Sequence, residues 1–284
     1  MKNDITLPNN PGFQGMAAAI ADIPFVCEGQ TQLITLVTPV WDRNAGKVPR
    51  FPFIVFLQGS AWTSPNRYAQ LPQLCRYAQQ GIAVASITHR DATLGNPFPA
   101  YLKDAKAALR FLRSQAEAFG LDPERAGFFG TSSGGNTALL VGLTGNDPRY
   151  GTDDYAEYSD AVKAVADCFG AADLPAMQNQ NGSGSDKFMD IFTSLIAGWD
   201  VGEVLRAMSP IYEVRNGASY PPFLLVHGDA DPVVPYGQSL RMHGRLKEAG
   251  AWSRLVRIAG AEHEGTFWSE TLHTMIFEHF RTHL

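Results

Sequence analysis

The hexapeptide Gly130-Thr131-Ser132-Ser133-Gly134-Gly135 contains the residue types that nucleophilic catalysis needs. Its first five residues match Gly-x-Ser-x-Gly, with Ser132 at the centre, between an apolar run typical of a strand and a run that suits a helix. Strand, tight turn and helix in that order hold a serine in a strained conformation above a parallel sheet. Glycine is needed at both flanks, because the two backbones pass too close there for a Cβ. This turn, called the elbow below, predicts that Ser132 is a nucleophile.

A serine nucleophile needs a neutral imidazole to take its proton and a carboxylate to orient that imidazole. The acid is expected just beyond a late strand, and both Asp229 and Asp231 follow the apolar run 223–227. We choose Asp231, because Asp229 lies within the turn, where an aspartate commonly caps backbone amides. His263 directly follows the last predicted strand and is the favoured base among the seven histidines. The others lie on predicted helices, at a strand end or in a loop: His89, His227, His243, His273, His279 and His283.

Acyl transfer also needs two backbone N–H groups that stabilise the oxyanion of the tetrahedral intermediate. Ser133, the residue after the nucleophile, is expected to supply the first amide. The loop Gln58-Gly59-Ser60-Ala61-Trp62 follows another buried strand and is expected to supply the second, from Ser60 or Ala61. Gly59 would permit the turn that this requires.

The apolar runs of the chain predict a sheet whose strand ends bring these residues together. Eight strands are expected, at residues 20–25, 33–40, 53–57, 82–87, 126–129, 164–169, 223–227 and 254–258. The first two suit a hairpin at the sheet edge, and the others suit buried parallel strands. Helices are expected after the elbow and at residues 72–80, 99–119, 237–249 and 269–283. This alternation predicts an α/β fold in one domain over residues 1–284, with a mostly parallel, eight-stranded sheet and helices on both faces.

Residues 171–210 contain no predicted strand and are the longest insertion between expected strands. A polar, low-complexity stretch begins at Gln178 within this segment, and a predicted helix follows it. Long insertions at one end of a sheet are often lids or binding loops, so a small lid is predicted here. Aromatic side chains of this segment and of the loop after residue 57 are the candidate substrate contacts: Trp62, Phe188, Phe192 and Trp199.

Composition and charge exclude several classes of partner and cofactor. A net charge of −5 without a basic cluster argues against nucleic acid or a membrane, and favours a small neutral substrate. The three cysteines lack metal-binding spacing, and neither a His-Glu-x-x-His helix nor a phosphate-binding loop is present, so no metal and no cofactor are expected. The N-terminus lacks the features of a signal peptide, and no apolar run is long enough to span a bilayer. A cytoplasmic location is predicted.

Several segments together resemble the serine carboxylesterase branch of the α/β-hydrolase superfamily: the loop 57–62, the approach 119–123, the elbow, the Asp231 loop and His263. Within that branch the chain is similar to bacterial acetyl- and feruloyl-esterase-like proteins and to the related arylformamidases, over most of residues 30–284. The resemblance implies the α/β-hydrolase fold, with Ser132, Asp231 and His263 as the catalytic triad. It also implies hydrolysis of carboxylic esters through an acyl-enzyme. The polar lid loop and the lack of a long apolar stripe beside the elbow favour short or aromatic acyl groups on carbohydrate or polyphenol alcohols over long-chain lipids.

Two other functions stay open at this point. An amide hydrolase of the arylformamidase type would use the same three residues, and a catalytically silent binding protein would keep only the fold. One departure from the family pattern concerns the loop at residues 58–62. Relatives often carry His-Gly-Gly-Gly/Ala-Trp where this chain has Gln58-Gly59-Ser60-Ala61-Trp62. The backbone donors survive that change, but the support of the first histidine does not.

Overall fold

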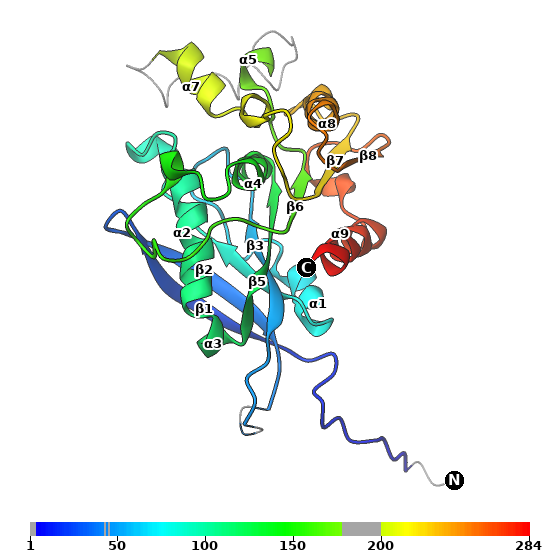
Figure 1. Ribbon diagram of the computed structural model, residues 1–284. Coiled ribbons are helices and arrows are strands. Elements are labelled where there is room, and N and C mark those ends of the chain that lie inside the picture. Colours follow the sequence, from blue (N-terminus) through cyan, green and yellow to red (C-terminus); the bar gives the residue numbers. More distant parts are fainter. Residues whose placement is uncertain (1–3, 43, 45, 178–199) are drawn as a thin grey trace.

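A computed structural model describes residues 4–42, 44, 46–177 and 200–284, which are built around one eight-stranded sheet (Figure 1). The strands are β1 (Ala17–Cys27), β2 (Gln30–Pro39), β3 (Phe51–Leu57), β4 (Ala83–Ile87), β5 (Leu121–Thr131), β6 (Ala164–Cys168), β7 (Phe223–Gly228) and β8 (Ser253–Ile258). The α-helices of the described part are α1 (Leu71–Gln79), α2 (Ala100–Ser114), α3 (Ala116–Phe119), α4 (Ser133–Leu143), α5 (Leu174–Met177), α7 (Val201–Ala207), α8 (Gly237–Glu248) and α9 (Glu270–His283).

The strand order is β1-β2-β4-β3-β5-β6-β7-β8. β1 pairs with β2 and β2 with β4 in antiparallel fashion, and the pairs from β4 through β3 to β8 are all parallel. The predicted sheet, mostly parallel with an antiparallel hairpin at one edge, is therefore confirmed. Because parallel strands end at the same edge, the loops after β3, β5, β7 and β8 meet there.

Helices cover both faces of the sheet, as predicted (Figure 1). Neighbouring residues of β3 face opposite layers: Val55 packs in the core shared with α2, α4 and α8, and Phe56 packs in the core shared with α1 and α9. Both side chains are buried. A strand buried on two sides needs apolar residues at every position, which explains the uninterrupted apolar runs of the sequence.

Two predicted elements differ most from the structure in their extent. The helix expected at 99–119 is two helices, α2 and α3, which are separated at Gln115. The Ser114 hydroxyl and the Gln115 amide both donate to the Phe111 carbonyl at the end of α2. The strand before the elbow begins at Leu121 rather than at residue 126, with a register irregularity opposite Phe51 and Phe53.

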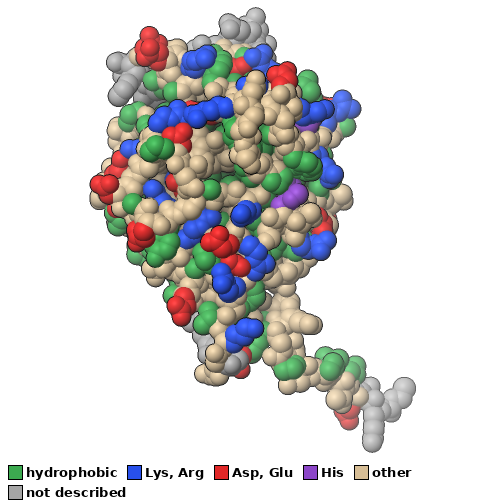
Figure 2. Space-filling view, in the orientation of Figure 1, with side chains coloured by type: hydrophobic (Ala, Val, Ile, Leu, Met, Phe, Trp, Pro, Cys, Tyr) green, Lys and Arg blue, Asp and Glu red, His purple; other side chains and the backbone are tan. Residues whose placement is uncertain are grey.

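The predicted lid segment is described only at its two ends, by α5 and α7. Asn136 on α4 holds both ends, because its amide nitrogen donates to the Ala171 and Met208 carbonyls at 2.8 Å each. The predicted polar stretch and the helix after it fall within residues 178–199, outside the described residues. Among the described helices, none has the length and apolar character of a membrane span. Figure 2 shows basic and acidic side chains interspersed over one face of the molecule.

Candidate active site

Ser132 lies between β5 and α4 with a φ of 53° and a ψ of −121°, a strained conformation for a residue with a Cβ. The flanking glycines explain how the turn closes. A Cβ built on Gly130 would lie 1.9 Å from the Gly134 carbonyl oxygen, and one on Gly134 would lie 2.1 Å from the Leu57 carbonyl oxygen. No larger residue fits at either position, so the sequence pattern dictates the elbow.

The structure brings together the three residues that the sequence singled out. His263 Nε2 lies 3.1 Å from Ser132 Oγ, and His263 Nδ1 lies 2.7 Å from Asp231 Oδ2. The three residues come from the loops after β5, β7 and β8, at one edge of the sheet. The Asp231 side chain is fully buried, whereas 15% of the His263 side chain is exposed. The Phe169 ring packs on the imidazole with centroids 4.6 Å apart. This arrangement allows proton transfer from Ser132 to His263.

Asp231 is surrounded by hydrogen-bond donors. Its Oδ1 accepts from the amides of Val233 and Val234 at 2.8 and 2.9 Å, and its Oδ2 faces His263 and, at 3.3 Å, His227 Nε2. Burial by itself would raise the pKa of the Asp231 carboxyl, but the hydrogen bonds from His227 and His263 outweigh it and hold that pKa well below its usual range. Asp231 is therefore a stable anion beside the imidazole.

His227 is a contact of this site that the sequence analysis assigned to an ordinary role. Its side chain is fully buried, with Nε2 2.8 Å from the Val234 carbonyl and Nδ1 2.7 Å from Ser239 Oγ. A carbonyl only accepts, so Nε2 carries a proton, and Asp231 Oδ2 lies within reach of the same proton. His227 thus ties Asp231 to the backbone of its own loop.

The other aspartate of this loop has a different role from the one predicted. Asp229 was expected to cap its own turn, but Oδ1 accepts from the amide of Gly260 in the loop after β8, at 2.6 Å. Asp231 itself accepts the two amides of the turn. Asp229 joins the loops that carry the acid and the imidazole, and it makes no contact with His263 among the interactions found in the described residues.

The loop after β3 lies directly against the elbow. A Cβ built on Gly59 would be 2.5 Å from Ser132 Cβ, which explains the glycine at this position. The Gly59 amide donates to Thr131 Oγ1, and the Ser60 amide donates to Ser133 Oγ, both at 2.9 Å. The hydroxyls on either side of Ser132 therefore fix the position of this loop.

These bonds distinguish the two amides that the sequence left as alternatives. The Ser60 amide is bonded to Ser133 Oγ and is not directed at a substrate. Ala61, which has a φ of 52°, follows it, and no acceptor for its amide is found in the described part of the chain. The Ser133 amide lies at the first position of α4, where helix geometry leaves an N–H without an intrahelical partner. Ala61 and Ser133 are thus the candidate oxyanion donors, and Ser60 is not.

The structure does not support Trp62 as a substrate contact, and the other three predicted contacts are not described. Trp62 is only 1% exposed, and its ring packs against Tyr101 with centroids 6.0 Å apart. Its side chain therefore belongs to the core and presents no surface to a substrate, contrary to the sequence-based expectation. The Trp62 backbone has a φ of 59° at the end of the loop. Phe188, Phe192 and Trp199 lie outside the described residues.

Sequence reasoning missed the side chains of Thr131, Ser133 and His227. Their hydroxyl and imidazole groups act on neighbouring residues, and no spacing rule distinguishes them from ordinary polar residues. Within the described residues, no group of three or more His, Cys, Asp or Glu side chains is arranged to hold a metal ion.

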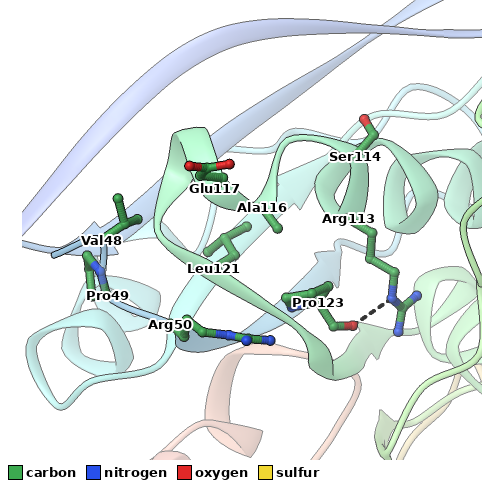
Figure 3. A pocket seen from close by; sticks show the side chains of 9 residues that line it. All are labelled: Val48, Pro49, Arg50, Arg113, Ser114, Ala116, Glu117, Leu121 and Pro123. Carbon is green, nitrogen blue, oxygen red and sulfur yellow. Dashed lines mark hydrogen bonds between the residues drawn. The ribbon is translucent and has the colours of Figure 1, made fainter.

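A pocket of about 410 Å³ lies at the opposite edge of the sheet, where β3 and β5 begin (Figure 3). Its walls include Arg50, Leu121 and Arg113, whose Nε donates to the Pro123 carbonyl at 2.8 Å. Parallel strands place this pocket at the amino ends and Ser132 at the carboxyl ends, so it forms no part of the site described above.

Comparison with known proteins adds to this geometry. The family profile described as BD-FAE matches residues 42–246. The chain is 30% identical over 250 residues to "Esterase LipQ" of Mycobacterium tuberculosis, an alignment that covers 87% of this chain and 57% of that protein. It is 32% identical over 213 residues to "Esterase LipC" of the same organism, which covers 73% of this chain and 51% of that protein. The chain thus spans about half the length of the curated relatives it matches.

A solved structure matches nearly the whole fold. The truncated form of a carbohydrate esterase from gut microbiota superposes with a TM-score of 0.79 at 26% identity, covering 97% of this chain and 99% of that one. Because both chains are covered almost completely, the likeness includes the sheet and the helices on both of its faces.

Proposed function

The chain belongs to the BD-FAE family and has the α/β-hydrolase fold, and on this premise we propose that it is a serine-dependent carboxylic ester hydrolase. The observation that carries the proposal is the hydrogen-bonded series Asp231, His263 and Ser132 at a strained elbow. The names of the relatives, which are esterases, support the same reaction.

The geometry supports a two-stage mechanism. Ser132 Oγ attacks the ester carbonyl carbon while His263 Nε2 takes the hydroxyl proton, and Asp231 stabilises the resulting imidazolium. The amides of Ala61 and Ser133 donate to the oxyanion, where a donor is typically worth about 3 kcal/mol in the transition state. The bond to the alcohol then breaks, and the alcohol leaves with the proton from His263. Water repeats the same steps on the acyl-enzyme and releases the acid.

For the substrate we propose esters with short or aromatic acyl groups on hydroxylated alcohols. The "carbohydrate esterase" title of the structural neighbour supports this class. We also propose that residues 1–284 form one domain and that residues 171–210 bind substrate. In support, Asn136, four positions after Ser132, bonds both described ends of that segment. The cytoplasmic location stays a prediction from the sequence.

The test is hydrolysis of p-nitrophenyl acetate, butyrate and laurate, methyl ferulate and N-formylkynurenine by the wild type and by Ser132→Ala. We expect turnover on the short or aromatic esters and a loss of roughly 10⁵-fold or more in the variant, because the nucleophile and its base act as a unit. Equal turnover by Ser132→Ala would refute the serine mechanism. Preference for N-formylkynurenine would assign the site to formamide hydrolysis, and turnover of none would favour a binding protein.

A further inference from the structure

A second pocket, of about 250 Å³, lies beside the proposed active site. Its lining includes Gln58, Gln70, Gln73, Glu264, Trp268 and His273. Two of these residues connect it directly to the site: Glu264 follows His263, and Gln58 precedes Gly59, whose backbone lies against Ser132. Gln70 and Gln73 lie at the start of α1, Trp268 lies just before α9, and His273 lies in the first turn of α9. The pocket therefore lies next to the reacting groups and between two helices of one face.

Two polar atoms of the lining have no partner within the described chain. His273 is 8% exposed, and its Nδ1 is a buried atom without a hydrogen bond. The same holds for Gln70 Oε1. Burying a polar group without a partner typically costs about 1–3 kcal/mol, so such atoms are rare unless something else satisfies them.

Two other side chains of the lining form one hydrogen bond each and keep a further donor or acceptor. Gln58 Oε1 accepts from the Asn66 amide at 2.7 Å, which leaves the amide nitrogen as a donor. Glu264 Oε2 accepts from Trp268 Nε1 at 2.6 Å, which leaves Oε1 as an acceptor. Glu264 also has a φ of 64° and a ψ of −156°, a region that is nearly exclusive to glycine. The chain thus holds this carboxylate in the pocket wall at a cost in backbone strain.

The polar atoms of the lining indicate which chemical groups of a ligand the pocket can bind. The lining offers both acceptors and donors, and a hydroxyl group can donate to the first and accept from the second. The partly exposed Trp268 ring offers an apolar surface, and it stacks on His273 with centroids 5.0 Å apart at 15°. Burial and the nearby Arg76 lower the pKa of His273, so its ring is neutral at pH 7. An acyl chain would leave all of these polar atoms unpaired.

We propose that this pocket binds the alcohol part of the ester when that alcohol carries several hydroxyl groups, as a sugar ring does. The proposal rests on the proposed ester hydrolysis and extends it, because it assigns the alcohol side of the substrate to named residues outside the triad. The volume is below the roughly 300–1,000 Å³ of pockets for drug-sized ligands, so it fits a single small ring.

The test uses two acetates with the same acyl group: the primary acetate of methyl glucopyranoside, and cyclohexylmethyl acetate, which has a ring without hydroxyls. Two variants remove pocket groups with little risk to folding. Gln73 is exposed on α1, and His273→Phe keeps a ring against Trp268 while it removes the unpaired nitrogen. Gln79→Ala is the matched control, an exposed glutamine on the same helix outside this pocket.

We expect Gln73→Ala and His273→Phe each to lower kcat/KM for the sugar acetate about 5–10-fold, mainly through KM, which is the effect of one hydrogen bond. Turnover of cyclohexylmethyl acetate and the activity of Gln79→Ala should stay close to wild type. No change on the sugar acetate, or an equal loss on both esters, would overturn the assignment. A preference for acetylcholine that the variants abolish would also overturn it, because the pocket would then bind a cation.

A binding measurement on a variant without catalytic activity tests the pocket assignment separately from the proposed ester hydrolysis. Ser132→Ala removes the nucleophile and leaves the pocket unchanged, so binding of methyl glucopyranoside to it is measured by saturation-transfer NMR. If the wild type hydrolyses neither acetate but the sugar binds and Gln73→Ala weakens that binding about 5–10-fold, the pocket assignment holds and the proposed function fails. If the sugar does not bind to Ser132→Ala and the wild type does not prefer the sugar acetate, the pocket assignment fails, whatever the esterase activity.

Discussion

Two buried carboxylates near the carboxyl ends of neighbouring strands have opposite electrostatic surroundings. Asp231 follows β7 and is held by two backbone amides and two imidazoles. Asp167 lies within β6, and among the described residues only the Gly170 amide donates to it, at 2.9 Å. Its Oδ2 is buried without a partner in the described chain. Burial acts on both side chains, so the number of donors decides which of the two stays charged.

The pKa values follow this difference. Burial raises the pKa of Asp167 from its usual 3.8 to about 7, against the opposing effects of His227 and the Gly170 amide. The pKa of Asp231 is held below its usual range despite burial, by the two histidines and the Val234 amide. A carboxylate that stabilises an imidazolium has to remain an anion, and the chain meets this need by adding donors rather than by exposing Asp231 to water.

The largest expected effect is on activity and concerns Asp231. Asp231→Asn should lower kcat on p-nitrophenyl acetate by about 10⁴-fold, because the amide no longer stabilises the imidazolium and favours the wrong tautomer of His263. Asp229→Asn is the matched control in the same loop and should keep most of the activity. A larger loss of kcat in Asp229→Asn than in Asp231→Asn would show that Asp229, and not Asp231, is the acid of the triad.

The second prediction concerns stability and the carboxylate with a single donor. The unfolded chain loses the Asp167 proton near pH 3.8 and the folded chain near pH 7, so the folded state holds more protons between these values. The stability that protonated Asp167 contributes is complete below pH 3.8 and is lost as the pH rises through about 7.

Asp167→Asn cannot ionise, so it should be more stable than the wild type by up to about 4 kcal/mol above pH 7 and should lose this advantage near pH 4. Urea unfolding at both pH values measures the difference. An advantage that does not depend on pH would show that packing, and not the charge of Asp167, limits stability. Turnover should change little, since Asp167 makes no hydrogen bond to the triad among those found in the described residues.

The sequence predicted the parts of this site that depend on local rules. The elbow follows from Gly130 and Gly134, because the backbone leaves no room for a Cβ. The strands follow from apolar runs that are buried on two sides, and His263 follows from its position after the last strand. Each of these features leaves a recognisable pattern among residues that are close in sequence.

The features that the sequence did not predict depend on packing between distant segments. Whether the Ser60 or the Ala61 amide faces the substrate depends on the hydroxyl of Ser133, 73 residues away. The helix break at Gln115 leaves no signal in the hydrophobic periodicity, which continues from α2 into α3. Gln70 and His273 share a pocket only because α1 and α9 pack on the same face.

The smallest effect sharpens the comparison of the two carboxylates by removing one donor from Asp231. His227→Phe keeps a ring of similar size but deletes the Nε2 proton that Asp231 and the Val234 carbonyl share, so kcat should fall roughly 10–100-fold, as for a hydrogen bond to a charged group. His227→Gln retains an N–H donor at the position of Nε2 and should restore most of kcat, with similar melting temperatures for both variants as the control for folding. If glutamine and phenylalanine lower kcat equally, packing and not the donated proton is what His227 contributes, and the donor count no longer explains why Asp231 and Asp167 differ.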